Sequence, residues 1–280
     1  MDARLRLLTE DDIEDGAALL EAAYGRPGTW RQDLTLHLAL DPDLWFGAEM
    51  RGRLVGIGGA RWYETFAWIG LMGVLPACGG LGLGGRILDR VIEAARERGA
   101  ESMVLDASVA GERLYLSRGF SDHGITTLFE RASQGDALPA CGVEVAGIED
   151  LEALAAFDAS LFAADRTAAL AALLSQPSTL AYVSRAGGDI AGYIMARDKR
   201  IIGPWLALND QAAGSLLAAV LTLAFDGPAQ LRIPGQNPSA EAIARRAGFV
   251  EVRRLRHMAL GPYPPQRRDR IYGEASFSLG

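Results

Sequence analysis

The segment from Met72 to Glu97 constrains the fold of this chain more than any other. A short apolar run ends at Pro76, and five glycines then occur within the seven residues 79–85. An amphipathic helix pattern begins directly after them. Ordering neighbouring glycines costs backbone entropy, which indicates that the backbone at this point comes close to a partner. The pattern therefore predicts an α/β unit in which a strand leads through a glycine loop into a helix.

The start of that helix is suited to binding an anion. The first N–H groups of a helix have no intrahelical partner, and they carry a partial positive charge. Phosphate groups bind there readily. Glycines would also let a pyrophosphate lie directly against the amides. The segment thus predicts a ligand that contains phosphate, and a glycine-rich turn without a ligand is the alternative.

Two well-known phosphate-binding loops fit the segment poorly. Gly80, Gly82 and Gly85 satisfy the G-x-G-x-x-G spacing of dinucleotide-binding folds. In that fold the strand runs straight into the first glycine, whereas residues 76–78 intervene here and several elements precede the loop. Asp106 lies further past Gly80 than the acidic residue of that motif does. A kinase-type phosphate loop is excluded, because no Gly-Lys-Ser/Thr follows.

The same order of elements occurs twice along the 280 residues. The first half reads as a strand, two helices, three strands, an amphipathic helix, a strand, a short helix and a last strand. The second half reads as a strand, one helix, three strands, a helix, a strand and a short helix. That short helix ends at Gly119-Phe120 in the first half and at Gly248-Phe249 in the second. The stretch "QGDALPACG" between the halves has the composition of a loop. We therefore predict two duplicated α/β domains, residues 1–136 and 137–280, with the boundary near Ala137.

Two motifs of the first half resemble those of the GCN5-related N-acetyltransferases (GNAT). The first is V-x-P-x-x-G-G-x-G-x-G before an amphipathic helix, and its residues are Val74, Pro76, Gly79, Gly80, Gly82 and Gly84. The second is S-x-x-G-x-x-L-Y-x-x-x-G-F, and its residues are Ser108, Gly111, Leu114, Tyr115, Gly119 and Phe120. Gly79 replaces the Gln or Arg that is usual in the family, and Ser108 replaces the usual Asn.

The resemblance implies two tandem GNAT-like domains, each with a mixed, splayed central sheet flanked by helices. It implies that the first is an acetyl-CoA-dependent N-acetyltransferase, in which an amine attacks the thioester directly. The second would be a degenerate copy, as in bacterial tandem acetyltransferases, whose closing segments are echoed by "LRHMALG" and "GEASFSLG". The residues that would bind acetyl-CoA are Met72, Val74, Gly79, Gly80, Leu81, Gly82, Leu83, Gly84, Gly85, Ser108 and Gly111.

The resemblance also supplies candidates for the chemistry. Tyr115 matches the tyrosine that protonates the departing thiolate, and a phenol with a pKa of about 10 suits that role. No motif specifies a general base: Glu64 in the turn "WYETF" and Asp106 late in its strand are candidates, and either could be a solvated surface carboxylate. His257 is expected to pack in a strand. The aromatic residues expected to wall the acceptor site are Tyr24, Trp30, Trp62 and Tyr63, for each of which a core role is equally consistent.

Composition narrows the partners. The formal net charge is −7 without a basic stripe, which argues against a nucleic-acid ligand. No run of about 18 uncharged apolar residues occurs, and the N-terminus has no apolar signal segment, so a cytoplasmic protein is expected. The two cysteines lack metal-ligand spacing, so we expect no metal. The acceptor would be a small-molecule or peptide amine, and the oligomeric state stays open. The alternatives are a non-catalytic acyl-CoA-binding or regulatory module and a transferase that uses another acyl donor.

The second half lacks the features that would make it a second acetyl-CoA site. No glycine occurs between Trp205 and Ala213, and Asn209 or Asp210 is predicted to cap the helix that follows. A capping side chain would occupy the N–H groups that a pyrophosphate needs. Ala244 stands at the position of the catalytic tyrosine. The sequence therefore predicts one acetyl-CoA per chain.

Overall fold

The computed structural model describes residues 3–132 and 142–280 of the chain, which form two compact units. The first unit comprises Met1–Leu105, Ala110–Ser121 and Ala259–Tyr263, and the second unit comprises Asp106–Val109, Asp122–Met258 and Pro264–Gly280. The boundary predicted near Ala137 lies outside the described residues.

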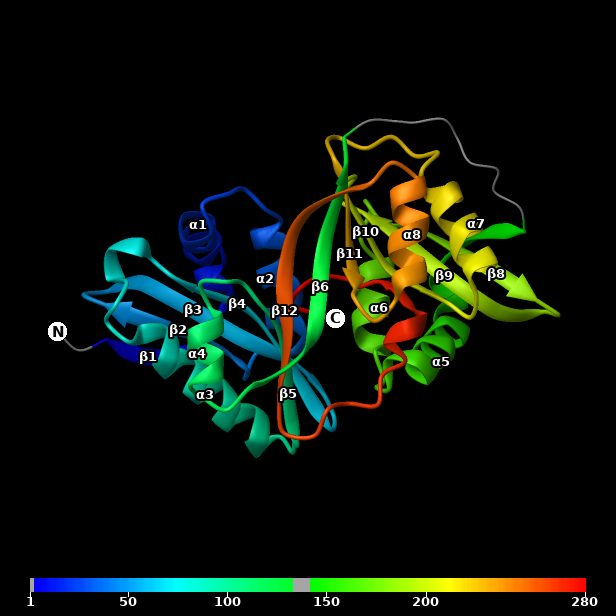
Figure 1. Ribbon diagram of the computed structural model, residues 1–280. Helices are drawn as coiled ribbons and strands as arrows, with labels where there is room; N and C mark the ends of the chain where they lie inside the picture. The colour runs from blue at the N-terminus through cyan, green and yellow to red at the C-terminus, as the bar shows by residue number, and fades with distance from the viewer. Residues whose placement is uncertain (1–2, 133–141) are drawn as a thin grey trace. The chain divides into compact units, whose positions relative to one another are not determined.

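The first unit is a sheet with helices on both faces (Figure 1). Its strands follow the spatial order β1-β2-β3-β4-β5. All neighbours are antiparallel except β4 and β5, which are parallel. The elements are β1 (Arg4–Leu7), α1 (Ile13–Tyr24), α2 (Trp30–Leu40), β2 (Trp45–Met50), β3 (Arg53–Tyr63), β4 (Phe66–Val74), α3 (Leu83–Glu97), β5 (Ser102–Ala107) and α4 (Glu112–Leu116).

Glycines in β3 and β4 let α1 and α3 pack closely on opposite faces of this sheet. A side chain on Gly56 would approach Ile87 of α3 to 3.0 Å. Gly73 of β4 pairs with the residue that follows Gly56 in β3. A side chain on Gly73 would approach Leu20 of α1 to 3.1 Å. Because side chains alternate along a strand, these neighbours place the two helices on different faces. The apolar face predicted for the amphipathic α3 is buried, and it includes Ile87, Leu88, Val91 and Ile92.

The parallel strands β4 and β5 diverge after a short paired stretch. Pairing joins Phe66 to Ser102 and ends with Trp68 and Val104. Strand β4 continues to Val74 beside β3, with a register shift where Leu71 and Met72 face Gly58. This two-against-one arrangement is a β-bulge. The predicted mixed, splayed sheet flanked by helices is confirmed.

The second unit repeats this architecture. Its strands follow the order β12-β6-β11-β10-β9-β8-β7, and β13 pairs with β10. The elements are β6 (Ser121–Arg131), β7 (Val143–Ala146), α5 (Leu151–Phe162), α6 (Thr167–Leu174), β8 (Leu180–Ala186), β9 (Asp189–Arg197), β10 (Ile201–Ala207), α7 (Asp210–Val220), β11 (Ala229–Pro234), α8 (Pro238–Arg246), β12 (Val250–Leu260) and β13 (Ile271–Gly273).

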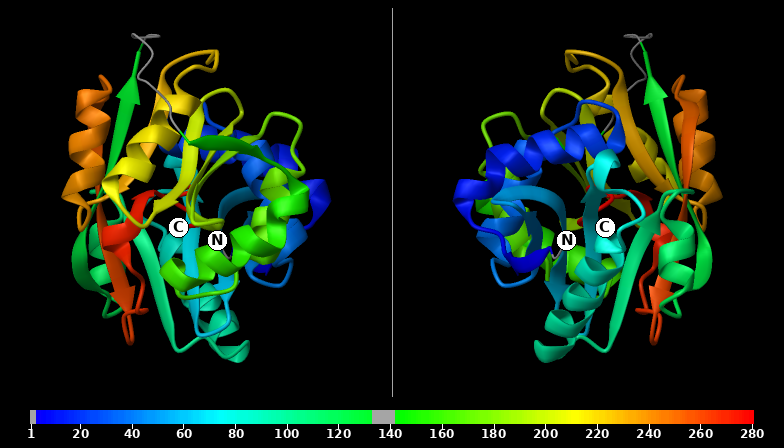
Figure 2. Two further views of the ribbon diagram at one scale, coloured as in Figure 1. Left: turned by 90° about the vertical axis from the view of Figure 1, so that its right-hand side faces the viewer. Right: turned by 90° about the vertical axis from the view of Figure 1, so that its left-hand side faces the viewer.

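Adjacent residues of β9 face different helices of the second unit. A side chain on Gly192 would approach Leu216 of α7 to 3.0 Å. The hydroxyl of Tyr193 instead donates a hydrogen bond to Asp158 of α5. Helices α5 and α7 therefore cover opposite faces of the sheet, which Figure 2 shows from two sides.

Strand β6 differs from the arrangement expected of two consecutive halves. It follows the Gly119-Phe120 motif in sequence, so we placed it in the first domain. In the structure it pairs antiparallel with β11, from Thr126 opposite Pro234 to Arg131 opposite Ala229. Each compact unit thus takes segments from both halves of the chain. Local periodicity predicted the strand, but it carries no information about a partner about 100 residues away.

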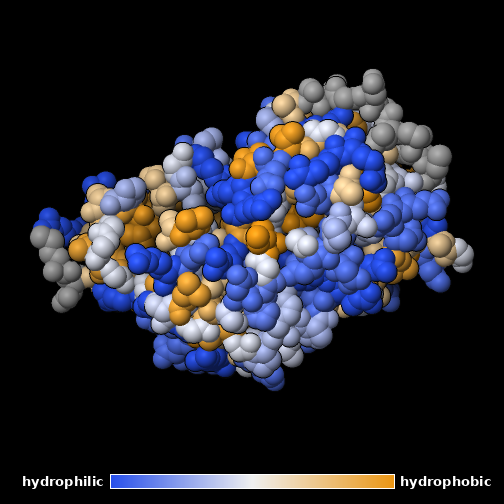
Figure 3. Space-filling view, viewed as in Figure 1, coloured by the Kyte–Doolittle hydropathy of each residue, from blue (hydrophilic) through white to orange (hydrophobic). Residues whose placement is uncertain are grey.

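The surface mixes apolar and polar residues over the face drawn in Figure 3. Large exposed apolar side chains include Leu81 in the glycine loop and Leu116 in α4. Among the described residues, no helix is both long and apolar enough to cross a membrane.

Candidate active site

The glycine loop leaves the start of α3 open. Gly82 precedes the helix in a left-handed conformation with φ 73°, and it provides no side-chain cap. Gly80 is also left-handed, with φ 78°. No atom lies within 4 Å of where a side chain on either glycine would begin. The loop and first turn therefore offer uncapped amides beside unfilled space, which is the arrangement that suits a phosphate group.

Gly84 and Gly85 extend this open turn in different ways. A Cβ on Gly84 would lie 3.6 Å from Leu114 of α4 and 3.8 Å from Val74 of β4, which are ordinary contacts. The guanidinium of Arg118 lies where a side chain on Gly85 would extend. Arg118 is paired with Asp89 at 3.0 Å. The predicted loop residues thus come together at the end of β4, within reach of α4.

The β-bulge of β4 brings three predicted site residues together. Leu71 has the unusual φ of 50°, and Met72 follows it in the bulge. The hydroxyl of Tyr24 in α1 donates a hydrogen bond of 3.2 Å to the carbonyl oxygen of Met72. Tyr24 also acts electrostatically on Tyr115. Tyr24, Met72 and Tyr115 therefore surround one position, at which β4 has already separated from β5.

Tyr115 is held in the state that a proton donor requires. It lies in α4, its side chain is buried, and its ring packs edge-on against Phe120 at 5.6 Å. Burial raises the pKa of the Tyr115 phenol above its usual value of 10, and Tyr24 contributes further in the same direction. The phenol therefore keeps its proton at neutral pH.

The other aromatic residues predicted at the acceptor site have different surroundings. Trp30 stacks on Tyr24 at 5.1 Å, so it lies beside the bulge. Trp62 and Tyr63 end β3 at the opposite end of β4, because Tyr63 pairs with Phe66. Tyr63 is only 1% exposed, and the guanidinium of Arg98 covers Trp62 at 4.5 Å. Tyr63 is thus buried in the core, the role that the sequence left as an alternative, whereas Trp62 is half-buried and its place at the acceptor site stays a prediction.

Glu64 lies far from the bulge. It occupies the turn between β3 and β4 with φ 56°, and it is exposed. Eight residues of extended strand separate it from Met72, which corresponds to about 26 Å. This position does not fit a base that acts directly at Met72. Closeness in sequence to β4 does not say which end of β4 a residue occupies, so a role of Glu64 through water stays a prediction.

Asp106 is grouped with the second unit, where it contacts a histidine that sequence reasoning did not use. The Asp106 side chain is fully buried, so the alternative of a solvated carboxylate is excluded. Its Oδ1 lies 3.0 Å from Nδ1 of His257 in β12. Burial raises the pKa of Asp106 to about 6. Ser108, predicted to bind acetyl-CoA, is also grouped with the second unit, whereas Gly111 precedes α4 in the first.

Comparison of the chain with models of known protein families agrees with this geometry. An Acetyltransferase (GNAT) family model matches residues 10–120, and an Acetyltransferase (GNAT) domain model matches residues 154–273. The chain belongs to the GCN5-related N-acetyltransferases. Two matches along one chain make it a tandem GNAT protein, as the resemblance implied, and its membership makes it an acyltransferase.

Solved GNAT structures resemble the whole chain. A protein from Pyrococcus horikoshii, provisionally designated an acetyltransferase, has a TM-score of 0.90 at 26% identity, covering 99% of this chain and 96% of that one. A GCN5-related N-acetyltransferase from Sphaerobacter thermophilus has a TM-score of 0.69 at 16% identity, covering 92% and 95%. A GCN5-related N-acetyltransferase from Kribbella flavida has a TM-score of 0.59 at 18% identity, covering 92% of this chain and 70% of that one. At these identities the Sphaerobacter and Kribbella structures show the fold alone. A search of curated proteins found no match.

In the part of the chain that matches the second GNAT model, the start of α7 is capped rather than open. The side chain of Asn209 caps α7 by accepting a hydrogen bond of 2.9 Å from the amide of Ala212. The neighbouring carboxylate of Asp210 accepts hydrogen bonds from Tyr272 at 2.6 Å and from Ser239 at 2.9 Å. These acceptors and the negative charge occupy the position where α3 has uncapped glycines.

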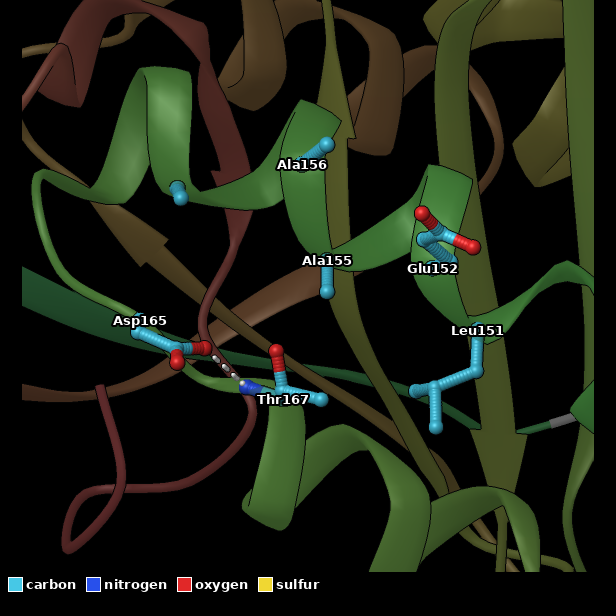
Figure 4. Close-up of a pocket in the computed structure, with 7 residues that line it drawn as sticks. Leu151, Glu152, Ala155, Ala156, Asp165 and Thr167 are labelled. Atoms are coloured by element: carbon cyan, nitrogen blue, oxygen red, sulfur yellow. Dashed lines mark hydrogen bonds between the residues drawn. The ribbon is translucent and has the colours of Figure 1, made fainter.

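A pocket of about 360 Å³ in the second unit does not match the predicted site either (Figure 4). It is lined largely by the side of α5, including Ala155, Ala156 and Glu152. At its edge the amide of Thr167 donates a hydrogen bond of 2.7 Å to Asp165. Its lining contains neither a glycine loop nor a phenol.

Proposed function

We propose that this GNAT protein transfers an acetyl group from acetyl-CoA to a primary amine. The observation that carries the proposal is the open, glycine-lined start of α3, which lies at the splayed end of β4 and where a side chain on Gly84 would contact Leu114, the residue before Tyr115 in α4. Amides without a capping side chain suit the pyrophosphate of CoA. The amine would attack the thioester directly, without an acyl-enzyme.

The first unit supplies three contributions to this reaction. The loop Gly79–Gly85 would hold the pyrophosphate, and the backbone near Met72 and Val74 would orient the thioester. Tyr115 would protonate the leaving thiolate, because its buried phenol carries a proton at neutral pH. Tyr24 would fix the bulge through its hydrogen bond to the Met72 carbonyl. Trp30, stacked on Tyr24, would wall the acceptor amine.

For the general base we retain Asp106 rather than Glu64. The raised pKa of Asp106 lies closer to neutrality, where a general base works best. The Oδ1 of Asp106 lies 3.0 Å from Nδ1 of His257, which would hold the carboxylate in a fixed orientation. His257 would then be a positioning residue.

Release of free CoA thiol in the presence of a panel of amines tests the proposed function. The panel should include amino acids, polyamines, aminoglycosides and peptide N-termini, with acetyl-CoA, longer acyl-CoAs and charged tRNA compared as donors. We expect amine-dependent thiol release with acetyl-CoA. Tight acetyl-CoA binding without turnover on any amine would instead favour a non-catalytic acyl-CoA-binding module.

One chain should bind one acetyl-CoA, because Asn209 and Asp210 occupy the start of α7. Isothermal titration of the purified protein should give a stoichiometry near one. Two equivalents per chain would show that the second GNAT match is a working site and that its description as a degenerate copy is wrong.

A further inference from the structure

A group of polar side chains is buried inside the second unit. Its residues come from β5, β6, β12, the 3-10 helix Arg268–Arg270 and the segment after β13. The side chains of Asp106 and His257 are 0% exposed, and those of Arg268 and Glu274 are 3% and 1% exposed. Thr126 of β6 is buried beside them. Two carboxyl groups are thus removed from water together, which is costly unless their charge is compensated.

Hydrogen bonds account for one oxygen of each carboxyl group. His257 Nδ1 lies 3.0 Å from Asp106 Oδ1. Arg268 Nη2 donates to Glu274 Oε1 at 2.8 Å, and the Thr126 hydroxyl donates to the same oxygen at 3.4 Å. Within the described residues, Asp106 Oδ2 and Glu274 Oε2 are buried and have no hydrogen-bond partner.

The two carboxyl groups are also close to each other. One oxygen of each, together with a ring nitrogen of His257, lie within 4.8 Å of one another. Two ionised carboxylates can only accept hydrogen bonds. A pair of buried acceptors at this separation therefore requires either a proton or a cation between them.

The net charge of the buried group decides between a shared proton and a bound cation. Two ionised carboxylates and the guanidinium of Arg268 leave one negative charge in excess. Burial lowers the pKa of His257 well below its usual value, Arg268 and His123 lower it further, and Glu274 and Asp122 oppose them without outweighing burial, so the ring is neutral. One proton makes the group neutral, whereas a divalent cation would leave it with a buried positive charge. Since a buried net charge is unfavourable, the proton is favoured.

We infer that Glu274 and Asp106 hold one proton between them, carried on Glu274 Oε2 and donated to Asp106 Oδ2. Asp106 is then the carboxylate, and it accepts a second hydrogen bond from the Nδ1–H of His257. Arg268 and Thr126 hold the other oxygen of Glu274. Every polar atom of the two carboxyl groups is satisfied in this arrangement, and the second unit contains a one-proton acid–base centre.

The pKa directions agree with this assignment. Burial raises the pKa of Glu274 from 4.5 to about 7 and that of Asp106 from 3.8 to about 6, so the proton stays on Glu274 longer as the pH rises. The folded protein binds this proton more tightly than the unfolded chain. Its stabilising contribution is therefore fully present below about pH 4.5 and is lost as the pH rises towards 7.

The centre also matters for the reaction, although this consequence alone rests on the proposed function. If Asp106 accepts the amine proton, the pair passes from one bound proton to two. Glu274 would then be a positioning residue, because its proton keeps Asp106 in a fixed orientation.

Glu274→Gln and Asp106→Asn test the shared proton. The amide of either variant keeps a donor permanently between the two side chains, and the remaining carboxylate balances Arg268. We expect each variant to fold, and to lose the fall in unfolding free energy that wild type shows between pH 5 and 7 in denaturant titrations. The double variant would leave Arg268 as an unbalanced buried charge, so it should be much less stable than either single variant.

Matched measurements separate this inference from its rivals. Glu152→Gln, an exposed change in α5, should keep the wild-type pH dependence. Infrared spectra of wild type at pH 6 should show a protonated carboxyl band that Glu274→Gln lacks. An unchanged pH dependence in both single variants would overturn the inference, as would stoichiometric metal in purified wild type that both variants lose. None of these readouts needs acetyl-CoA, so they stand apart from any failure of the proposed function.

Discussion

Gly84→Glu is expected to weaken acetyl-CoA binding by about 100-fold or more. The new side chain would fill the space between α3, Leu114 and Val74, and its charge would repel the pyrophosphate. Each hydrogen bond to a charged group contributes about 1.5–3 kcal/mol, and about 1.4 kcal/mol corresponds to a tenfold change in affinity. Losing two of them therefore gives a change of this size. Isothermal titration with acetyl-CoA measures it.

The structure shows why Gly84 is a better choice than Gly82. Gly82 has φ 73°, so any side chain there strains the backbone and could unfold the loop. Gly84 makes only ordinary contacts, and an acidic residue in the first turn stabilises a helix. Gly214→Glu in α7 is the matched control, because it has open space in the second unit and should leave affinity unchanged. A folded Gly84→Glu protein with wild-type affinity would show that CoA does not bind at α3.

Tyr115→Phe is expected to lower kcat about 10- to 1000-fold while acetyl-CoA affinity changes little. The ring remains to pack against Phe120, and only the proton donor is lost. Proton transfer by a positioned side chain is commonly worth about 100- to 10,000-fold, and water would replace part of it. Single-turnover kinetics with the best acceptor amine measures the chemical step.

The pKa of Tyr115 adds a second expectation for the same residue. Because burial raises it above 10, the phenol stays protonated and should cause no loss of activity between pH 7 and 9. Tyr182→Phe, the same chemical change on β8, is the control and should retain full activity. If Tyr115→Phe also turns over at the wild-type rate with chemistry limiting, then the acid is another group or water.

The sequence by itself determined the local features of the candidate site. The spacing of Val74, Pro76 and the glycines predicted a strand, an open loop and a helix, and the structure contains β4, the loop and α3 at these positions. The register of Tyr115 with Gly119-Phe120 placed the tyrosine in a short helix, where it is found. These features depend on residues that are close together in the sequence, so periodicity and glycine spacing are enough to predict them.

Only the tertiary structure decided which distant side chains meet. It placed Glu64 at the end of β4 away from Met72, and it buried Tyr63. It paired β6 with β11, and it brought Asp106 against His257 and Glu274, which lie more than a hundred residues further along the chain. His257 was expected only to pack, because it lies in a strand near the end of the second half. Strand order and register come from burying whole faces of sheets and helices, and that long-range packing cannot be read from the short patterns that predict each element.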